Sequence, residues 1–210
     1  MVGEVVGEVV GEVELTAAGA LSSRQVRSKK MIRHAAQGAA RDKLARLRAA
    51  NPGRDIFLMN FQLPGRPGHV SWMLWFAVSD RGALDEQFMP LWEEFRDADD
   101  AWRNARLKMM VVMPEGPFLL RKAMPGNKPV IIGKGIALKY FRGEGYLEAN
   151  VDIASSGSAT KMWGMVQSMV TTLVLDIAFI IEAKEAHQLP ERLLGAVRCQ
   201  KCDLGTCPTI

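Results

Sequence analysis

Apolar residues continue almost without interruption from residue 160 to residue 183, and this run organises the rest of the chain. As a helix it would be roughly 36 Å long, since each residue of an α-helix adds about 1.5 Å. Ser168, Thr172 and Asp176 recur at every fourth position, which would place them in one narrow polar stripe on that helix. The pattern therefore predicts a long helix that is buried on most of its surface and ends before Pro190.

Upstream of this run, apolar and polar residues alternate over short segments, which is typical of strands with one buried face. The clearest alternation places Leu147 and Val151 opposite Glu148. The strands predicted in this way cover residues 56–63, 70–78, 107–113, 116–123, 130–141, 145–153 and 194–203, the last of them as an edge strand. A turn at residues 64–68 joins the first two strands into a hairpin, and a helix begins near Pro90.

Short strands joined by short turns favour an antiparallel sheet, whose apolar face must be covered by another element. The long apolar segment is the natural cover. We therefore expect an α+β fold in which an antiparallel sheet of five to seven strands packs on a long apolar C-terminal helix.

The first fifty residues differ in composition from the rest. Residues 2–13 repeat the unit Val-Gly-Glu-Val three times, which predicts a disordered leader or an extended ribbon. Nine Lys and Arg residues between residues 24 and 48 predict a basic helix, which is either an arm attracted to anionic lipid or nucleic acid or a helix exposed to solvent. We divide the chain into a low-complexity leader (1–20), a basic helical arm (21–50), the main domain (51–205) and a tail (206–210).

The net charge of +4 comes from the first fifty residues. Residues 1–50 carry nine of the 27 basic and five of the 23 acidic residues, so the remainder of the chain is neutral. A neutral domain argues against nucleic acid as a partner, because phosphate binding needs a concentrated basic face. The acidic, Gly-rich start is unlike a secretory signal, and five polar residues interrupt the apolar run, so we expect a cytoplasmic protein without a transmembrane span.

The sequence offers little catalytic or metal-binding chemistry. Cys199, Cys202 and Cys207 begin like half of a zinc site or like a redox pair, but no fourth ligand stands at a suitable spacing. The acidic cluster at residues 97–100 lacks the glycine and the distal glutamate of a calcium loop. Neither a phosphate-binding loop nor a nucleophile with its base can be recognised. We expect reduced thiols, no metal, no cofactor and no catalytic residues.

Four basic residues on the predicted central strands and the turn after them would suit an anionic headgroup or an acidic partner if they share a face. They are Lys122, Lys134, Lys139 and Arg142. Asp176 is a fifth candidate, because a carboxylate within an apolar run must find a partner or take up a proton. Three interpretations of Asp176 stay open: a paired core residue, a polar group inside a lipid cavity, or, with Asp152 as the other candidate, a catalytic acid.

Several motifs stand in a recognisable order. They are residues 60–67 (Asn-Phe-Gln-Leu-Pro-Gly-Arg-Pro), 99–108, 116–123, 139–143 (Lys-Tyr-Phe-Arg-Gly), 146–148, 151–153 and 189–198 (Leu-Pro-Glu-Arg-Leu-Leu-Gly-Ala-Val-Arg). Through them, residues 56–204 resemble the C-terminal domain family of the plant Enhanced Disease Resistance protein Two. The motif residues that carry the resemblance are Pro64, Gly65, Arg66, Pro67, Arg103, Asn104, Arg106, Tyr140, Phe141, Arg142, Gly143, Asp152, Pro190, Glu191 and Gly195.

In that family the domain commonly follows a pleckstrin-homology module and a START lipid-transfer module. The resemblance implies a membrane-peripheral, lipid-associated regulator without catalytic residues. A START-like helix-grip is therefore a second possible arrangement of the sheet and the long helix. We expect a non-enzymatic module that binds a lipid in a hydrophobic cavity or at a membrane surface. The alternative is a protein-interaction module without a lipid ligand, in which Arg103, Arg106 and Arg142 face the partner.

Overall fold

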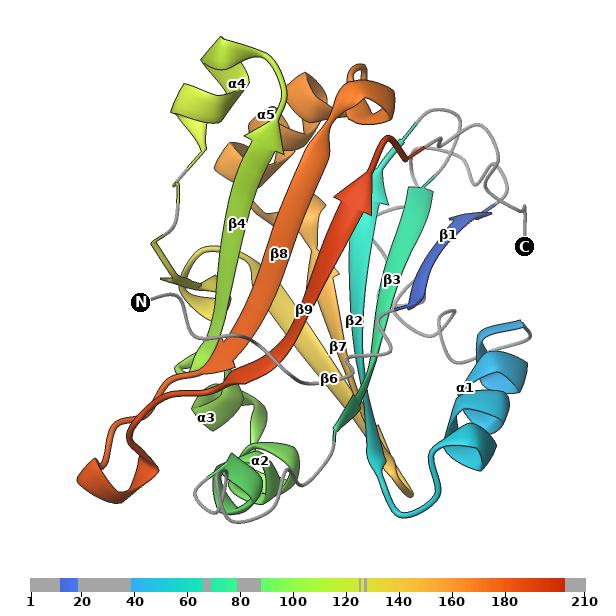
Figure 1. The fold of residues 1–210 in the computed structure, drawn as a ribbon, viewed down its shortest axis with the longest axis vertical. Helices are drawn as coiled ribbons and strands as arrows, with labels where there is room; N and C mark the ends of the chain where they lie inside the picture. Colours follow the sequence, from blue (N-terminus) through green and yellow to red (C-terminus); the bar gives the residue numbers. More distant parts are fainter. Residues whose placement is uncertain are drawn as a thin grey trace.

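The computed structural model describes residues 12–18, 39–65, 69–78, 88–124, 126 and 128–202. In them the chain forms two β-sheets that pack face to face, with short helices around their edges and ends (Figure 1). The first sheet has the order β1-β3-β2-β7-β6, with β1 Glu12–Ala18, β2 Asp55–Pro64, β3 His69–Val78, β6 Ala137–Gly143 and β7 Tyr146–Asp152. The second has the order β5-β4-β8-β9, with β4 Leu107–Glu115, β5 Val130–Ile131, β8 Val174–Ile181 and β9 Leu193–Gln200.

The helices are all short. The α-helices are α1 Ala39–Ala50, α2 Phe88–Asp97, α3 Asp100–Asn104, α4 Phe118–Ala123 and α5 Gly157–Val166. The 3-10 turns are η4 Ile132–Lys134, η5 Ile153–Ser155, η6 Val170–Thr172 and η7 Ala186–Gln188. Every helix among these described residues is too short or too polar to cross a bilayer.

The predicted long C-terminal helix is wrong. Residues 160–183 contain the end of α5, the turn η6 and then β8, which lies between β4 and β9. A continuous apolar run does not distinguish a buried helix from a buried central strand, and the β-branched residues that fill this one favour the strand. With the helix gone, the predicted single sheet on a helical cover is replaced by two sheets that cover each other.

Some of the other strand predictions are confirmed, and others are wrong. The β2–β3 hairpin and the edge strand β9 are confirmed, whereas β2 pairs with β7 in parallel rather than antiparallel fashion. Residues 116–123 form the helix α4 instead of a strand, and residues 130–141 are broken by η4 into β5 and β6. The fold is α+β, but its layers are not those predicted.

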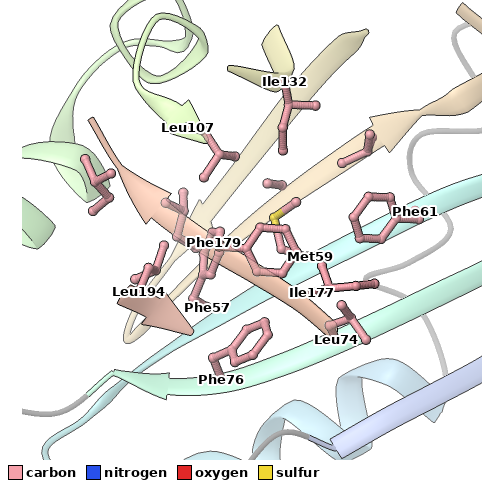
Figure 2. Packing of buried hydrophobic residues seen from close by; sticks show 14 of the residues in the cluster. Phe57, Met59, Phe61, Leu74, Phe76, Leu107, Ile132, Ile177, Phe179 and Leu194 are labelled. Atoms are coloured by element: carbon pink, nitrogen blue, oxygen red, sulfur yellow. The ribbon is translucent and has the colours of Figure 1, made fainter. Parts of the chain in front are cut away.

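Aromatic side chains hold the two sheets together at one end. Phe179 of β8 lies with its ring centroid 5.7 Å from that of Phe76 in β3, edge to face. The ring centroid of Phe57 in β2 lies 6.3 Å from that of Phe76, so Phe57 extends the same group of rings. Figure 2 shows Phe57, Phe76 and Phe179 in the shared core. Gly195 of β9 permits this approach, because a Cβ at that position would overlap the ring of Phe76.

The helix α1 covers the outer face of the first sheet. Leu44 and Leu47 pack against a second apolar cluster there, and the ammonium group of Lys43 lies 5.7 Å from the centroid of the Trp75 ring. Lys43 is buried, which a cation can tolerate over an aromatic face. The part of the predicted basic arm that the structure describes, residues 39–50, is therefore packed on the sheet, while residues 21–38 lie outside the described residues.

A buried arginine joins α2, α3 and β6. The Arg103 guanidinium donates to the backbone oxygens of Phe95 at 2.8 Å and Arg96 at 2.6 Å, at the C-terminal end of α2. It also donates to Asp100 at 3.1 Å and lies 5.1 Å from the centroid of the Tyr140 ring. Carbonyl groups at a helix C-terminus have no partners within the helix, so a cation suits this position.

The outer face of β2 and β7 carries a polar cluster that is nevertheless buried. Asn60 and Asn150 stand opposite each other in the parallel pair, and the Asn60 amide donates to the Asn150 side-chain oxygen at 2.7 Å. Glu148 is only 2% exposed. Burial raises the pKa of Glu148 to about 7, although hydrogen bonds with Asn150 and Asn60 offset part of the effect.

We predict that Glu148→Gln changes the pH dependence of stability. The folded protein keeps Glu148 protonated up to about pH 7, whereas the unfolded chain ionises it near its ordinary pKa of 4.5. Stability is therefore lost as pH rises through this window. Urea unfolding should show that the variant gains up to about 3 kcal/mol over the wild type at pH 8 and almost nothing at pH 4. An equal gain at both pH values, or the same profile for the exposed control Glu144→Gln, would contradict this.

We also predict that Arg103→Lys lowers the free energy of unfolding by about 2–4 kcal/mol, because lysine keeps the charge but cannot reach all three acceptors. Thermal or urea unfolding followed by circular dichroism measures the change. Arg54→Lys is the matched control at an exposed arginine and should stay within about 0.5 kcal/mol of the wild type. If both variants are equally stable, the buried arginine does not join these elements.

Candidate functional site

An apolar pocket of about 570 Å³ lies between the two sheets, at the end away from the aromatic contacts of Phe76 and Phe179. Its first two walls are the inner faces of the sheets. Phe61 and Leu63 of β2 stand on one side, and Leu175 and Ile177 stand on the other. Side chains alternate along a strand, so the same positions that build the core also line the pocket.

The helix α5 forms a third wall and is fixed at both ends. Ser156 caps its start by accepting from the Ala159 backbone N–H. The indole N–H of Trp163 donates to the backbone oxygen of Pro64 at 2.7 Å, which ties the helix to the end of β2. Ala159, Met162 and Trp163 all line the pocket. This wall is therefore positioned by specific hydrogen bonds as well as by apolar packing.

The fourth wall comes from the connection between β4 and β6. Met124, Val130 and Ile131 line the pocket from this side. Gly133 packs directly on the backbone of Asn104 in α3, where a Cβ would overlap it. The close approach holds this connection against the rest of the domain.

Few polar groups reach the pocket. Lys134 supplies the charged group among the lining residues, and Ser156 and Ser158 supply hydroxyl groups 3.1 Å apart. The indole N–H of Trp72, another lining residue, is buried without a hydrogen-bond partner in the structure. An apolar pocket with a few polar groups is the usual form of a small-molecule site.

Two free thiols also lie at the pocket wall. The Cys199 thiol donates to the sulfur of Cys202, which lowers the pKa of Cys202 to about 7 and raises the pKa of Cys199. Within the described residues, no three His, Cys, Asp or Glu side chains gather into a metal site. Cys207 lies outside the described residues.

The structure separates the five predicted ligand-binding residues. Lys134 lines the pocket, while Lys122 on α4 and Lys139 on β6 are exposed. Arg142 pairs with Asp97 at 2.9 Å. Asp176 lies on the face of β8 opposite Leu175 and Ile177, where Arg198 donates to it at 2.6 and 2.7 Å and holds its pKa below the ordinary value.

The family-motif residues that the structure describes mostly hold elements of the domain together, and Arg106, Glu191 and Asp152 do not line the pocket. Arg106 stacks over Trp102 at 3.7 Å, and Glu191 accepts from Lys108 at 2.8 and 2.9 Å. Asp152 caps η5 by accepting from the Ala154 N–H at 3.0 Å. Arg103, Arg106 and Arg142 are thus all engaged within the domain. Arg66 and Pro67 lie outside the described residues.

Sequence reasoning missed most of the pocket-lining residues as a set. Phe61, Leu63 and Trp72 lie on the predicted strands 56–63 and 70–78, but periodicity reports only the face of a strand and not the volume left beside it. Met162 and Trp163 were assigned to the long helix and so to a different neighbourhood. The adjacent sheet that completes the pocket becomes visible only once β8 is recognised as a strand.

Two comparisons with known proteins agree. The family described as "Protein ENHANCED DISEASE RESISTANCE 2, C-terminal" matches residues 13–203, a range that includes α1 and all of β1 except Glu12. A curated Arabidopsis thaliana protein, "Protein ENHANCED DISEASE RESISTANCE 2-like", is 36% identical over 160 residues, which are 75% of this chain and 21% of the relative. The chain thus spans about a fifth of that relative's length. No solved structure gives a significant match. The extent of the family match shows that this chain belongs to the Enhanced Disease Resistance 2 C-terminal domain family.

Proposed function

We propose that this domain is a non-enzymatic regulatory module that binds a lipid in the pocket between its two sheets. The observation that carries the proposal is the pocket itself. Its volume of about 570 Å³ falls within the range of roughly 300–1,000 Å³ that is usual for small-molecule sites. Apolar side chains make up most of its lining, so a ligand with a large apolar body gains most from entering it.

The polar groups favour a ligand with one polar or anionic end. Lys134 can form a charge-assisted hydrogen bond with a phosphate or carboxylate at the edge of the pocket. The hydroxyl groups of Ser156 and Ser158 and the free indole N–H of Trp72 offer further donors. An acyl chain with a charged headgroup combines the two features.

The positions of the two candidate catalytic acids favour a binding role of the domain over an enzymatic one. The carboxylate of Asp152 caps a turn and that of Asp176 is held by Arg198, and neither residue lines the pocket. The name of the Arabidopsis thaliana relative refers to disease resistance, which supports a regulatory role for a domain of this family.

We predict that filling the pocket prevents ligand uptake. In Ala159→Trp, the indole ring would occupy space between α5 and the sheets. Native mass spectrometry of the full chain, incubated with mixed liposomes or with oleate, should show a bound lipid on the wild type. The variant should show at least a tenfold lower bound fraction, because the ligand would have to displace the new side chain.

Gln167→Trp is the matched control, since it adds the same ring at an exposed position at the end of α5. It should bind as the wild type does, and circular dichroism should show that both variants are folded. A wild-type chain that remains free of lipid under both conditions would contradict the proposal. The protein-interaction module without a lipid ligand would then be the better hypothesis.

A further inference from the structure

Two large apolar side chains are exposed next to each other on one connection of the fold. Phe118 is 73% exposed and Leu119 is 78% exposed, while Val130, 42% exposed, lies apart from them in β5, opposite Met109. All three lie in residues 114–136, which we call the α4 segment, and the one other large hydrophobic residue exposed in the described part of the chain is Leu189. Clustered exposed apolar groups of this size usually mark an interaction surface.

The exposure of Phe118 and Leu119 follows from the geometry of α4. Pro117 precedes α4, and Leu120 in its first turn is buried in the core. Successive residues of a helix point about 100° apart, so with Leu120 fixed inward, Phe118 and Leu119 are directed away from the domain. Met124, just after the helix, lines the pocket and anchors the other end. The two exposed side chains therefore project from a helix that is attached at both ends.

Two exposed cations share the helix with the two apolar side chains. They are Arg121 and Lys122, and the one exposed carboxylate of the α4 segment is that of Glu115. The segment's other exposed cations, Lys128 and Lys134, flank β5, which pairs with the start of β4. A protruding apolar pair with two cations on the same helix complements a membrane with anionic headgroups, because the apolar groups enter the acyl layer while the cations contact phosphates.

The segment also forms part of the pocket. Val130, Ile131 and Lys134 line the pocket from the α4 segment. Figure 1 shows α4 at the same end of the molecule as α5, whereas the connection that carries Leu189, between β8 and β9, lies at the opposite end. Contact with a membrane through α4 would thus bring Met124, which follows α4 directly and lines the pocket, close to the lipid surface.

We propose that the α4 segment docks on an anionic membrane, with Phe118 and Leu119 inserted among the acyl chains and the neighbouring cations against the headgroups. The inference rests on the proposed function for its purpose, since the membrane would be the source from which the pocket takes its lipid. Docking depends on the exposed surface of α4 and can be measured separately from lipid uptake by the pocket.

Vesicle co-sedimentation of the full chain tests docking. The wild type should bind phosphatidylcholine vesicles that contain phosphatidylserine. The double variant Phe118→Ser/Leu119→Ser should bind them at least tenfold more weakly, because it loses two large apolar side chains. Arg121→Glu/Lys122→Glu should lose at least tenfold on the anionic vesicles only.

Matched controls lie at the opposite end of the molecule. Leu189→Ser removes the other exposed hydrophobic residue, and Lys184→Glu reverses an exposed cation. Both should bind vesicles within about twofold of the wild type. The basic residues before residue 50 are present in every variant, so differences among variants report the α4 segment alone. Circular dichroism shows whether each variant is folded.

Several results would overturn docking. These are absence of wild-type binding to anionic vesicles, full binding by the double serine variant, or an equal loss in Leu189→Ser. A wild-type dimer that the double serine variant converts to a monomer, with vesicle binding unchanged, would assign the surface to a second copy of the chain instead.

Uptake of oleate from solution, read by native mass spectrometry, separates the two proposals. If the wild type binds vesicles through Phe118 and Leu119 but takes up no oleate or vesicle lipid, docking stands and the proposed pocket function fails. If the double serine variant takes up oleate as the wild type does and binds vesicles equally well, the pocket function stands and docking fails.

Discussion

The close contact between the two sheets at Gly195 sets the shape of the whole domain. Phe76 can lie against β9 and Phe179 only because residue 195 has no side chain. At that end the sheets are held together by packed rings. Phe61 still contacts Phe179 across the sheets, with ring centroids 6.2 Å apart, but beyond it the inner faces carry Leu63, Leu175 and Ile177, and the space between them remains as the pocket. The packed end and the open end are thus two parts of one geometry.

The sequence predicts much of the strand content and little of the layering. Alternation correctly places β2, β3 and β7, because each has one face in the shared core and a distinct opposite face. It fails for β8, which is apolar on nearly every residue, and for α4, where Phe118, Leu119 and Leu120 suggest a strand. Both errors have one physical origin. A continuous apolar run, long or short, is compatible with either a helix or a strand, and tertiary packing decides between them.

The candidate site was likewise predicted only in part from the sequence. Lys134 was singled out from its sequence neighbourhood and does line the pocket, but Lys122, Lys139, Arg142 and Asp176 point elsewhere. These residues lie apart because of the order of the strands in the two sheets. The periodicity of the sequence does not reveal that order. Asp176 illustrates the point, since its partner Arg198 stands opposite it only because β8 pairs with β9.

The order of strands also affects how the chain is made. In the first sheet, β2 lies beside β7, which follows it by more than eighty residues, and in the second, β4 lies beside β8, about sixty residues later. A ribosome that has produced β2, β3 and β4 has therefore released β4 before either of its neighbours, β5 and β8, exists, and β2 before its neighbour β7. Apolar faces such as that of β4 stay uncovered until β8 and β9 emerge. During synthesis this domain depends on its last strands, and it is the kind of nascent chain that chaperones need to protect.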